Sequence, residues 1–343
     1  MTEIILTFFF ITILLLFLSS GVWVALSMVG VSTIGMILFT SRPVGDAMAT
    51  TIWGTSSSWT LTALPLFVWM GEILFRTKLS QNLFEGLSPW MQRLPGGLIH
   101  VNVVGCALFA AISGSSAATV ATVGKMSIPE LRKRNYPEKI LLGSLAGSGT
   151  LGLLIPPSII LIIYGVTVQE SIAKLFMAGI LPGVMIAIIF MGYVMVWSII
   201  NKKKMPEISE NFSLIEKIKK SGQLIPVIVL ILAVIGSIYS GIATATEAAS
   251  LGVLGALLLS FFQKSLSWDT FKNSLLGATK TSCMIAFILA GSSFLSLAMG
   301  FTGLPRNLAI WIEGMQLSPY VLIFVLMIFY IILGMFLDGI SAV

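Results

Sequence analysis

Four consecutive residues, Ser113-Gly114-Ser115-Ser116, bring three hydroxyl groups and one glycine into an otherwise apolar stretch of the chain. A helix interrupted in lipid leaves backbone groups unpaired, and this is tolerated only where the interrupted segment is buried in protein or lines a polar cavity. The carbonyl and hydroxyl oxygens freed at such a break can coordinate a cation. The alternative is that small side chains only allow two helices to pack closely.

Two further segments are also expected to interrupt a helix. The apolar run after Lys139 is interrupted by Gly147-Ser148-Gly149-Thr150 and then by Pro156-Pro157. An interior proline removes a helical hydrogen bond, so the pair predicts an unwound segment. The oxygens of Ser113–Ser116 and Gly147–Thr150 therefore predict a sodium site, because sodium accepts several uncharged oxygen ligands.

A related polar patch near the end of the chain favours this interpretation over simple packing. It contains Asp338, Gly339 and Ser341 at the end of an apolar run. We interpret Asp338 as lying at the tip of a second hairpin; the alternative is a helix cap at the membrane interface. Lys and Arg are nearly absent from the apolar runs, so helix N-termini and hydroxyls would have to hold an anionic substrate.

Composition places these breaks in a membrane. The chain has 343 residues, of which 57% are hydrophobic and only 10% charged, against roughly 25% charged in soluble domains. Apolar runs of bilayer length recur, which predicts an all-α protein that crosses the membrane several times. Basic loops account for the net charge of +6, so nucleic-acid binding is not indicated. We find no pattern typical of an enzyme, a resident cofactor or a metal site other than sodium.

The elements that must position the breaks can be read along the chain. The linker 201–223 is basic and expected to be cytoplasmic, and it separates residues 1–200 from residues 224–343. In the first part we expect paired spans over 4–39, a span over 52–75, a re-entrant hairpin over 97–124, a broken helix over 141–164 and a span over 176–200. In the second part we expect spans over 224–239 and 243–262, a span near 281–302 and a final apolar segment.

The two parts correspond to one another at an offset of 225 residues. Leu79-x-x-Asn82-Leu83 aligns with Leu304-x-x-Asn307-Leu308, and the Ser113–Ala117 segment aligns with Asp338–Ala342. Repeats that meet at broken helices are common in secondary transporters. The second repeat is expected to be truncated, with about 82 residues of its counterpart absent.

Basic residues predict that the repeats are inverted. With the N-terminus outside, seventeen of the twenty Lys and Arg residues lie in expected cytoplasmic segments, namely 76–93, 125–139, 201–220 and 263–280. The other three are Arg42, Lys174 and Arg306. This is the asymmetry that the positive-inside rule requires. The two hairpins are then expected to enter a bacterial or archaeal cytoplasmic (inner) membrane from opposite faces.

Several motifs resemble the large membrane subunit of tripartite ATP-independent periplasmic (TRAP) transporters. They include Leu64-Pro65-Leu66-Phe67, the hairpin Phe109–Leu131 and the broken segment Gly143–Gly165. Further matching motifs are Ala178–Gly183, Ala245–Ala249 and Phe336–Gly339. The resemblance extends over essentially the whole chain.

The resemblance implies a sodium-driven, elevator-type importer of small organic acids such as C4-dicarboxylates or sialic acid. It implies a periplasmic substrate-binding protein and a small four-helix membrane subunit as partners. The hairpins and broken helices would form a moving transport domain, with the remaining spans as scaffold. By position, one sodium site falls at Ser113–Ser116 with Gly147–Thr150, and a second involves Asp338–Ser341. Substrate is expected near Ser115, Ser116, Pro156 and Pro157.

Two alternatives stay open. One is a stand-alone sodium/carboxylate symporter of the same superfamily, which would work without a binding protein. The other is a membrane scaffold or docking subunit that transports nothing.

Overall fold

The computed structural model describes residues 2–77, 79–206 and 212–336, and within these ranges all regular structure is helical. Three of the described helices are long and apolar enough to cross a membrane, namely α10 (Ile172–Ile200), α13 (Ala245–Phe262) and α14 (Trp268–Phe301). The number rises to five if two pairs of helices separated by short breaks each count as one span. The expectation of an all-helical polytopic membrane protein is confirmed for these residues.

The chain divides into two compact units, residues 1–59 with 282–343 and residues 60–281. The first contains α1 (Thr2–Ser19), α2 (Val24–Phe39), α3 (Val44–Ser56), most of α14, α15 (Leu304–Gly314) and α16 (Pro319–Phe336). Its buried core includes Met36, Phe294 and Ala298. A tight turn with Gly21 at φ +79° joins α1 to α2. The two helices cover the segment 4–39, and its paired spans stay a prediction.

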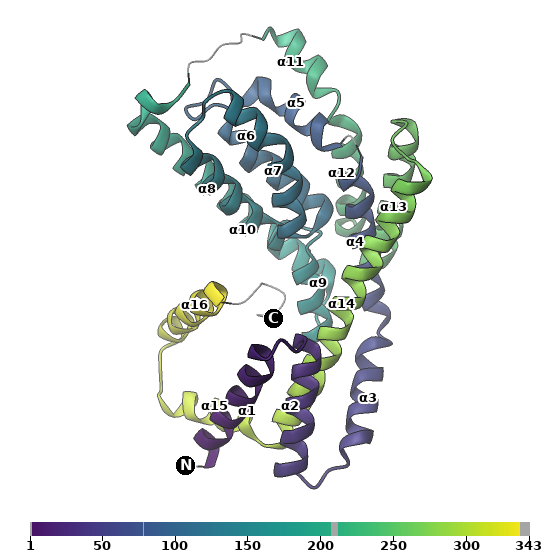
Figure 1. The fold of residues 1–343 in the computed structure, drawn as a ribbon, viewed down its shortest axis with the longest axis vertical. Coiled ribbons are helices and arrows are strands. Elements are labelled where there is room, and N and C mark those ends of the chain that lie inside the picture. The colour runs from purple at the N-terminus through teal and green to yellow at the C-terminus, as the bar shows by residue number, and fades with distance from the viewer. Residues whose placement is uncertain (1, 78, 207–211, 337–343) are drawn as a thin grey trace. The chain divides into compact units, whose positions relative to one another are not determined.

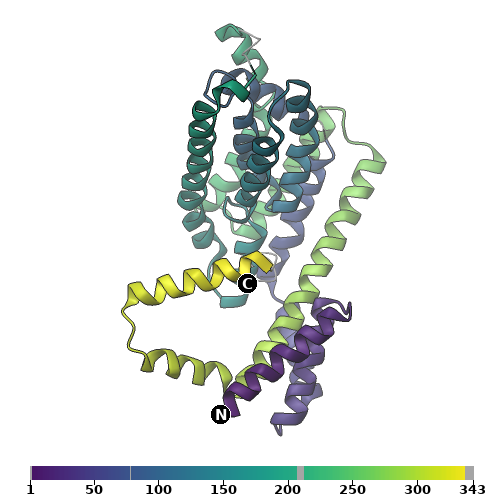
Figure 2. The ribbon, with the colours of Figure 1, turned by 60° about the vertical axis from the view of Figure 1, so that its left-hand side comes forward.

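The second unit holds the helix breaks. Its helices are α4 (Ala63–Phe75), α5 (Leu79–Met91), α6 (Ile99–Ser113), α7 (Ser116–Lys133), α8 (Glu138–Gly149), α9 (Ile159–Val168), α10, α11 (Leu214–Ser221), α12 (Ile225–Tyr239), α13 and the start of α14. Short 3₁₀ segments are η1 (Trp59–Thr62), η2 (Thr150–Leu153) and η3 (Lys202–Lys204). Helix α6 contacts α4, α5, α7, α8 and α10, so it forms the centre of this unit (Figures 1 and 2).

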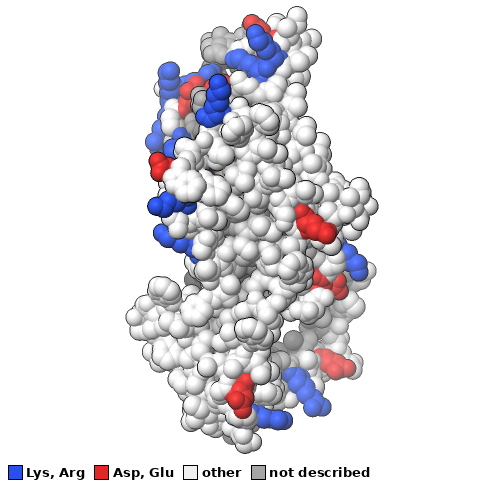
Figure 3. All heavy atoms as spheres, turned by 90° about the vertical axis from the view of Figure 1, so that its right-hand side faces the viewer, with Lys and Arg blue, Asp and Glu red and all other residues white. Residues whose placement is uncertain are grey.

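Burial explains why α6 is central and α10 peripheral. Most α6 side chains are buried, including Phe109 and Ile112. Helix α10 instead exposes large apolar side chains such as Leu181, Ile188 and Ile200. An apolar exposed face of this extent is typical of a helix surrounded by lipid. Figure 3 shows that side chains other than Lys, Arg, Asp and Glu cover most of one face, with Lys and Arg near the top and left of the view and a few more at its lower end.

Three predicted boundaries need correction. The expected single span over 52–75 is interrupted, because α3 ends at Ser56 and regular structure resumes only at Trp59. Consecutive serines at 56–58 provide side-chain hydroxyls that compete for backbone hydrogen bonds and so weaken a helix. The expected hairpin over 97–124 ends too early, because α7 continues to Lys133. The span expected near 281–302 begins earlier, because α14 starts at Trp268.

Candidate functional site

Residues 113–116 form the turn between two adjacent helices. Helix α6 ends at Ser113, and Gly114 follows in the left-handed conformation with φ +59°. Glycine is favoured there because other side chains strain that conformation. Ser115 then caps α7, since its hydroxyl accepts a hydrogen bond from the Ala118 amide at 3.4 Å. The polar segment thus ends one helix and begins the next.

Hydroxyl groups hold this turn in place. Ser113 Oγ lies 3.0 Å from Thr119 Oγ1, and Thr119 Oγ1 donates to the Ser115 carbonyl at 2.7 Å. Ser113 and Thr119 are both buried. Thr119 was not predicted as a site residue, although its spacing of four residues from Ser115 places it directly over the turn. The turn is therefore organised by residues on both of its helices.

The second break lies at the end of α8. Ser148 is fully buried, and its hydroxyl donates to the Ser144 carbonyl at 2.6 Å within the same helix. Thr150 is exposed, and its hydroxyl donates to the Gly147 carbonyl at 2.7 Å. After Gly149 the chain continues as η2 and then through buried Pro156 and Pro157 to α9. Ser158 caps α9, with its hydroxyl 3.5 Å from the Leu161 amide.

The two breaks are in direct contact. The Ile159 amide donates to the Gly114 carbonyl at 3.2 Å. A Cβ atom added to Gly114 would lie 2.5 Å from the Pro157 carbonyl oxygen. One added to Gly152 would lie 2.9 Å from both the Ser115 carbonyl carbon and the Ser116 amide nitrogen. The structure therefore brings Ser113–Ser116 against η2 and against the start of α9, at distances that only glycine permits.

Four helix ends meet at this contact. Helices α6 and α8 end there, and α7 and α9 begin there. The last carbonyls of a helix carry partial negative charge and favour cations, whereas the first amides carry partial positive charge and favour anions. The arrangement can therefore hold a cation and an anion side by side without a buried charged side chain.

Ser116 contributes an oxygen that the protein itself does not use. Ser116 Oγ is buried and has no hydrogen-bond partner among the described residues. The main chain of Ser116 also lies at the contact, because its carbonyl oxygen would be 3.8 Å from a Cβ atom on Gly149. Six other buried side-chain atoms of the described residues are also unpaired. Ser116 differs from them because its main chain lies at the contact of the two breaks, so its oxygen is the one that we consider for a ligand.

Residues of the second predicted site, Asp338, Gly339 and Ser341, lie outside the described residues. Other polar residues have structural partners instead. Glu247 forms a capping box with Thr244 at the start of α13. Glu72 pairs with Arg76 at 3.1 Å. His100 and Asn102 are fully buried, and they bond to the Pro95 carbonyl and to Ser144 respectively. His100 Nδ1 and Asn102 Oδ1 have no hydrogen-bond partner among the described residues.

These features define an all-helical membrane protein in which two helix breaks face one another across a polar contact. A sequence model of one family, described as "Tripartite ATP-independent periplasmic transporter, DctM component", matches residues 10–343. The chain belongs to this family of transporter components. The resemblance seen in its motifs is thereby confirmed.

Curated relatives are identical to this chain at about a third of the aligned positions. A C4-dicarboxylate TRAP transporter large permease protein from Pseudomonas aeruginosa is 32% identical, over 90% of this chain and 72% of the relative. A 2,3-diketo-L-gulonate TRAP transporter large permease protein from Escherichia coli is 33% identical, over 85% of this chain and 68% of the relative. An isethionate TRAP transporter permease protein from Oleidesulfovibrio alaskensis is 30% identical, over 96% of this chain and 51% of the relative.

Proposed function

We propose that this chain is the large membrane subunit of a sodium-coupled importer of small organic acids. Membership of the family supports a transport role, and the relatives are named as permeases. The site supports the coupling ion and the charge of the substrate. A passive scaffold needs no paired helix breaks, whereas a carrier uses them to bind its cargo.

The proposal of sodium coupling depends chiefly on one residue, Ser116. Its hydroxyl is buried and unpaired, and its main chain lies at the contact of the two breaks. The ligands that we propose are oxygens of Ser113, Gly114, Ser115 and Ser116 together with those of Gly147, Ser148, Gly149 and Thr150. The Ser148 and Thr150 hydroxyls donate to carbonyls, which leaves their lone pairs available to a cation. Asp338, Gly339 and Ser341 are proposed for a second site.

An organic acid is the substrate class that the helix ends favour. The first turns of α7 and α9 flank the contact, near Ser115, Ser116, Pro156 and Pro157. The Ala118, Ile159 and Leu161 amides already donate to protein oxygens, so the proposed donors are the other amides of these first turns. Such amides bind carboxylates without a nearby Lys or Arg. The relatives are named for C4-dicarboxylate, isethionate, 2,3-diketo-L-gulonate and ectoine, so the proposal extends to the class and not to one compound.

The rest of the mechanism follows from the family and the sequence repeat. We propose two inverted repeats, a transport domain of hairpins and broken helices, and elevator movement against a scaffold. The partners proposed are a periplasmic substrate-binding protein and a small membrane subunit; one relative is named as a joined DctMQ permease. The proposed location is the cytoplasmic membrane with the N-terminus outside.

Sodium-dependent uptake in proteoliposomes tests the proposal. The chain is reconstituted with its binding protein and small subunit, and the sodium concentration for half-maximal uptake is measured. Ser116→Ala and Thr150→Ala should each raise that concentration about tenfold, because each removes one oxygen ligand worth about 1.4 kcal/mol. Ser127→Ala is the matched control, because Ser127 Oγ is also buried and unpaired but lies about 16 Å further along α7.

Three results would count against the proposal. Unchanged sodium dependence in Ser116→Ala and Thr150→Ala would exclude these ligands. Absence of uptake in the complete assembly would favour a scaffold subunit. Full uptake without the binding protein would favour a stand-alone symporter.

A further inference from the structure

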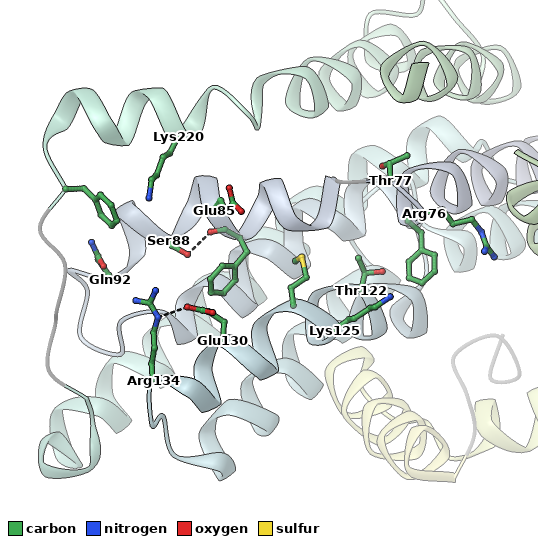
Figure 4. A pocket seen from close by; sticks show the side chains of 14 residues that line it. Arg76, Thr77, Glu85, Ser88, Gln92, Thr122, Lys125, Glu130, Arg134 and Lys220 are labelled. Atoms are coloured by element: carbon green, nitrogen blue, oxygen red, sulfur yellow. Dashed lines mark hydrogen bonds and ion pairs between the residues drawn. The ribbon is translucent and has the colours of Figure 1, made fainter. Parts of the chain in front are cut away.

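A polar cavity lies away from the helix breaks, between α5, α7 and α11 (Figure 4). Its volume is about 780 Å³, which is within the usual range of small-molecule pockets. Ten of its fourteen lining residues are polar or charged. The sequence did not predict this cavity, because its lining residues come from four separate segments of the chain.

Packing between α5 and α11 fixes one wall of the cavity. Trp90 Nε1 donates to Ser221 Oγ at 2.7 Å, and the Lys217 ammonium lies 5.3 Å from the centre of the Trp90 ring. A Cβ atom on Gly86 would lie 2.7 Å from Leu224 Cγ, so the two segments pack closely. Helix α7 contacts α5 and forms the opposite wall. The cavity is therefore a built feature of the second unit.

The charges of the cavity are predominantly positive. Its lining contains Arg76, Lys125, Arg134 and Lys220 but only two acids, Glu85 and Glu130. Arg76 pairs with Glu72 at 3.1 Å, and Arg134 pairs with Glu130 at 2.8 Å. The Lys220 ammonium lies 4.0 Å from the centre of the Phe212 ring. Lys125 forms no hydrogen bond, ion pair or ring contact with any described residue.

Lys125 lies at the end of the cavity that is nearer to the helix breaks. Figure 4 shows Lys125 beside Thr122 at one end, and Arg134 and Lys220 towards the other. Thr122 follows Ser116 by six residues, which is about 9 Å along α7. A small anion leaving the contact of the helix breaks would meet the Lys125 ammonium within a short distance. The end of the cavity with Arg134 and Lys220 belongs to the segments 125–139 and 201–220, which the distribution of Lys and Arg predicts to be cytoplasmic.

We propose that this cavity is a release-side site for small carboxylates, in which the Lys125 ammonium binds the carboxylate group. The proposal rests on the function proposed above and adds a second position for the same substrate class. Polar lining and limited volume favour a small organic acid over a phospholipid, whose acyl chains require an apolar groove. Neither Lys125 nor Lys220 has an ion pair with a described acid, and Lys125 is the one nearer to the helix breaks. A lysine ammonium suits release, because it attracts an anion without binding it in a bidentate geometry.

Protection of a cysteine in the cavity tests the site directly. Met126 lines the cavity beside Lys125, so Met126→Cys is introduced with Cys283→Ser, which removes the exposed native thiol. The second native cysteine, Cys106, is fully buried. A neutral thiol reagent labels the reconstituted protein, and succinate is the probe. Succinate should slow labelling, and Lys125→Gln should raise the half-protecting concentration about tenfold, because a charge-assisted hydrogen bond is lost.

Lys133→Gln is the matched control, because Lys133 is exposed on the same helix but does not line the cavity; its half-protecting concentration should stay unchanged. Lys125→Arg should keep most of the protection. The proposal is overturned if succinate gives no protection, or protects Lys125→Gln equally well. It is also overturned if phosphatidylglycerol added to phosphatidylcholine nanodiscs protects without succinate, since the site would then belong to a lipid headgroup. Sodium-dependent uptake is measured separately, so this site can fail while the proposed transport function stands.

Discussion

Gly114→Ala is the substitution that most directly examines the contact between the two helix breaks. Alanine in the left-handed conformation that Gly114 adopts costs about 1 kcal/mol. The new Cβ would lie 2.5 Å from the Pro157 carbonyl oxygen, so the turn has to move by nearly 1 Å to reach an ordinary contact distance of about 3.4 Å. That movement weakens the hydrogen bond from the Ile159 amide to the Gly114 carbonyl, which contributes about 1 kcal/mol.

The combined cost of this substitution is about 2–4 kcal/mol. Thermal unfolding can be followed by dye labelling of Cys106, which is fully buried, in a Cys283→Ser background. Gly114→Ala should label at a lower temperature, and in the complete transporter it should raise the sodium concentration for half-maximal uptake about tenfold or more. The sodium effect is expected because the turn carries the proposed ligands Ser115 and Ser116.

Gly143→Ala is the matched control on α8. A Cβ atom at Gly143 meets nothing within 4 Å, and alanine favours a helix interior over glycine by about 0.5–1 kcal/mol. This variant should label at the same or a slightly higher temperature and keep its sodium dependence. If Gly114→Ala behaves like Gly143→Ala in both measurements, the reasoning about a close contact at Gly114 is wrong.

Two predictions concern residues remote from the proposed ion site. Tyr136→Phe should lower the unfolding temperature, because it removes the hydroxyl that accepts from the Leu98 amide at 3.0 Å, at a cost of about 1–3 kcal/mol. The sodium dependence of uptake should stay unchanged. A changed sodium dependence would contradict the view that Tyr136 is remote from the ion site. Arg132 donates hydrogen bonds to Glu138 and so holds the pKa of that carboxyl below its usual value. A lowered pKa means that the pair survives down to low pH, so any difference in unfolding temperature between wild type and Glu138→Gln should stay constant from about pH 8 to pH 5. A difference that shrinks within that window would contradict the assignment.

The sequence by itself determined the membrane character, the family and the position of the helix breaks. Hydropathy is a local property, and so is the tendency of Gly114, Ser115 and the Pro156-Pro157 pair to end or begin helices. Local residue preferences did not predict the helix end at Ser56–Ser58, where serine hydroxyls compete for backbone hydrogen bonds. They also did not predict that α7 continues through a basic segment to Lys133.

Only the tertiary structure decided which breaks touch and which oxygens stay unpaired. The Gly114 carbonyl accepts a hydrogen bond from the Ile159 amide, 45 positions away in the chain. The Ser148 hydroxyl donates to a carbonyl of its own helix, whereas Ser116 Oγ has no partner among the described residues. The cavity around Lys125 likewise needs α5, α7 and α11 together. These contacts depend on the register in which helices pack, and packing is set by the combined shape of many side chains. No local pattern of residue types encodes that shape.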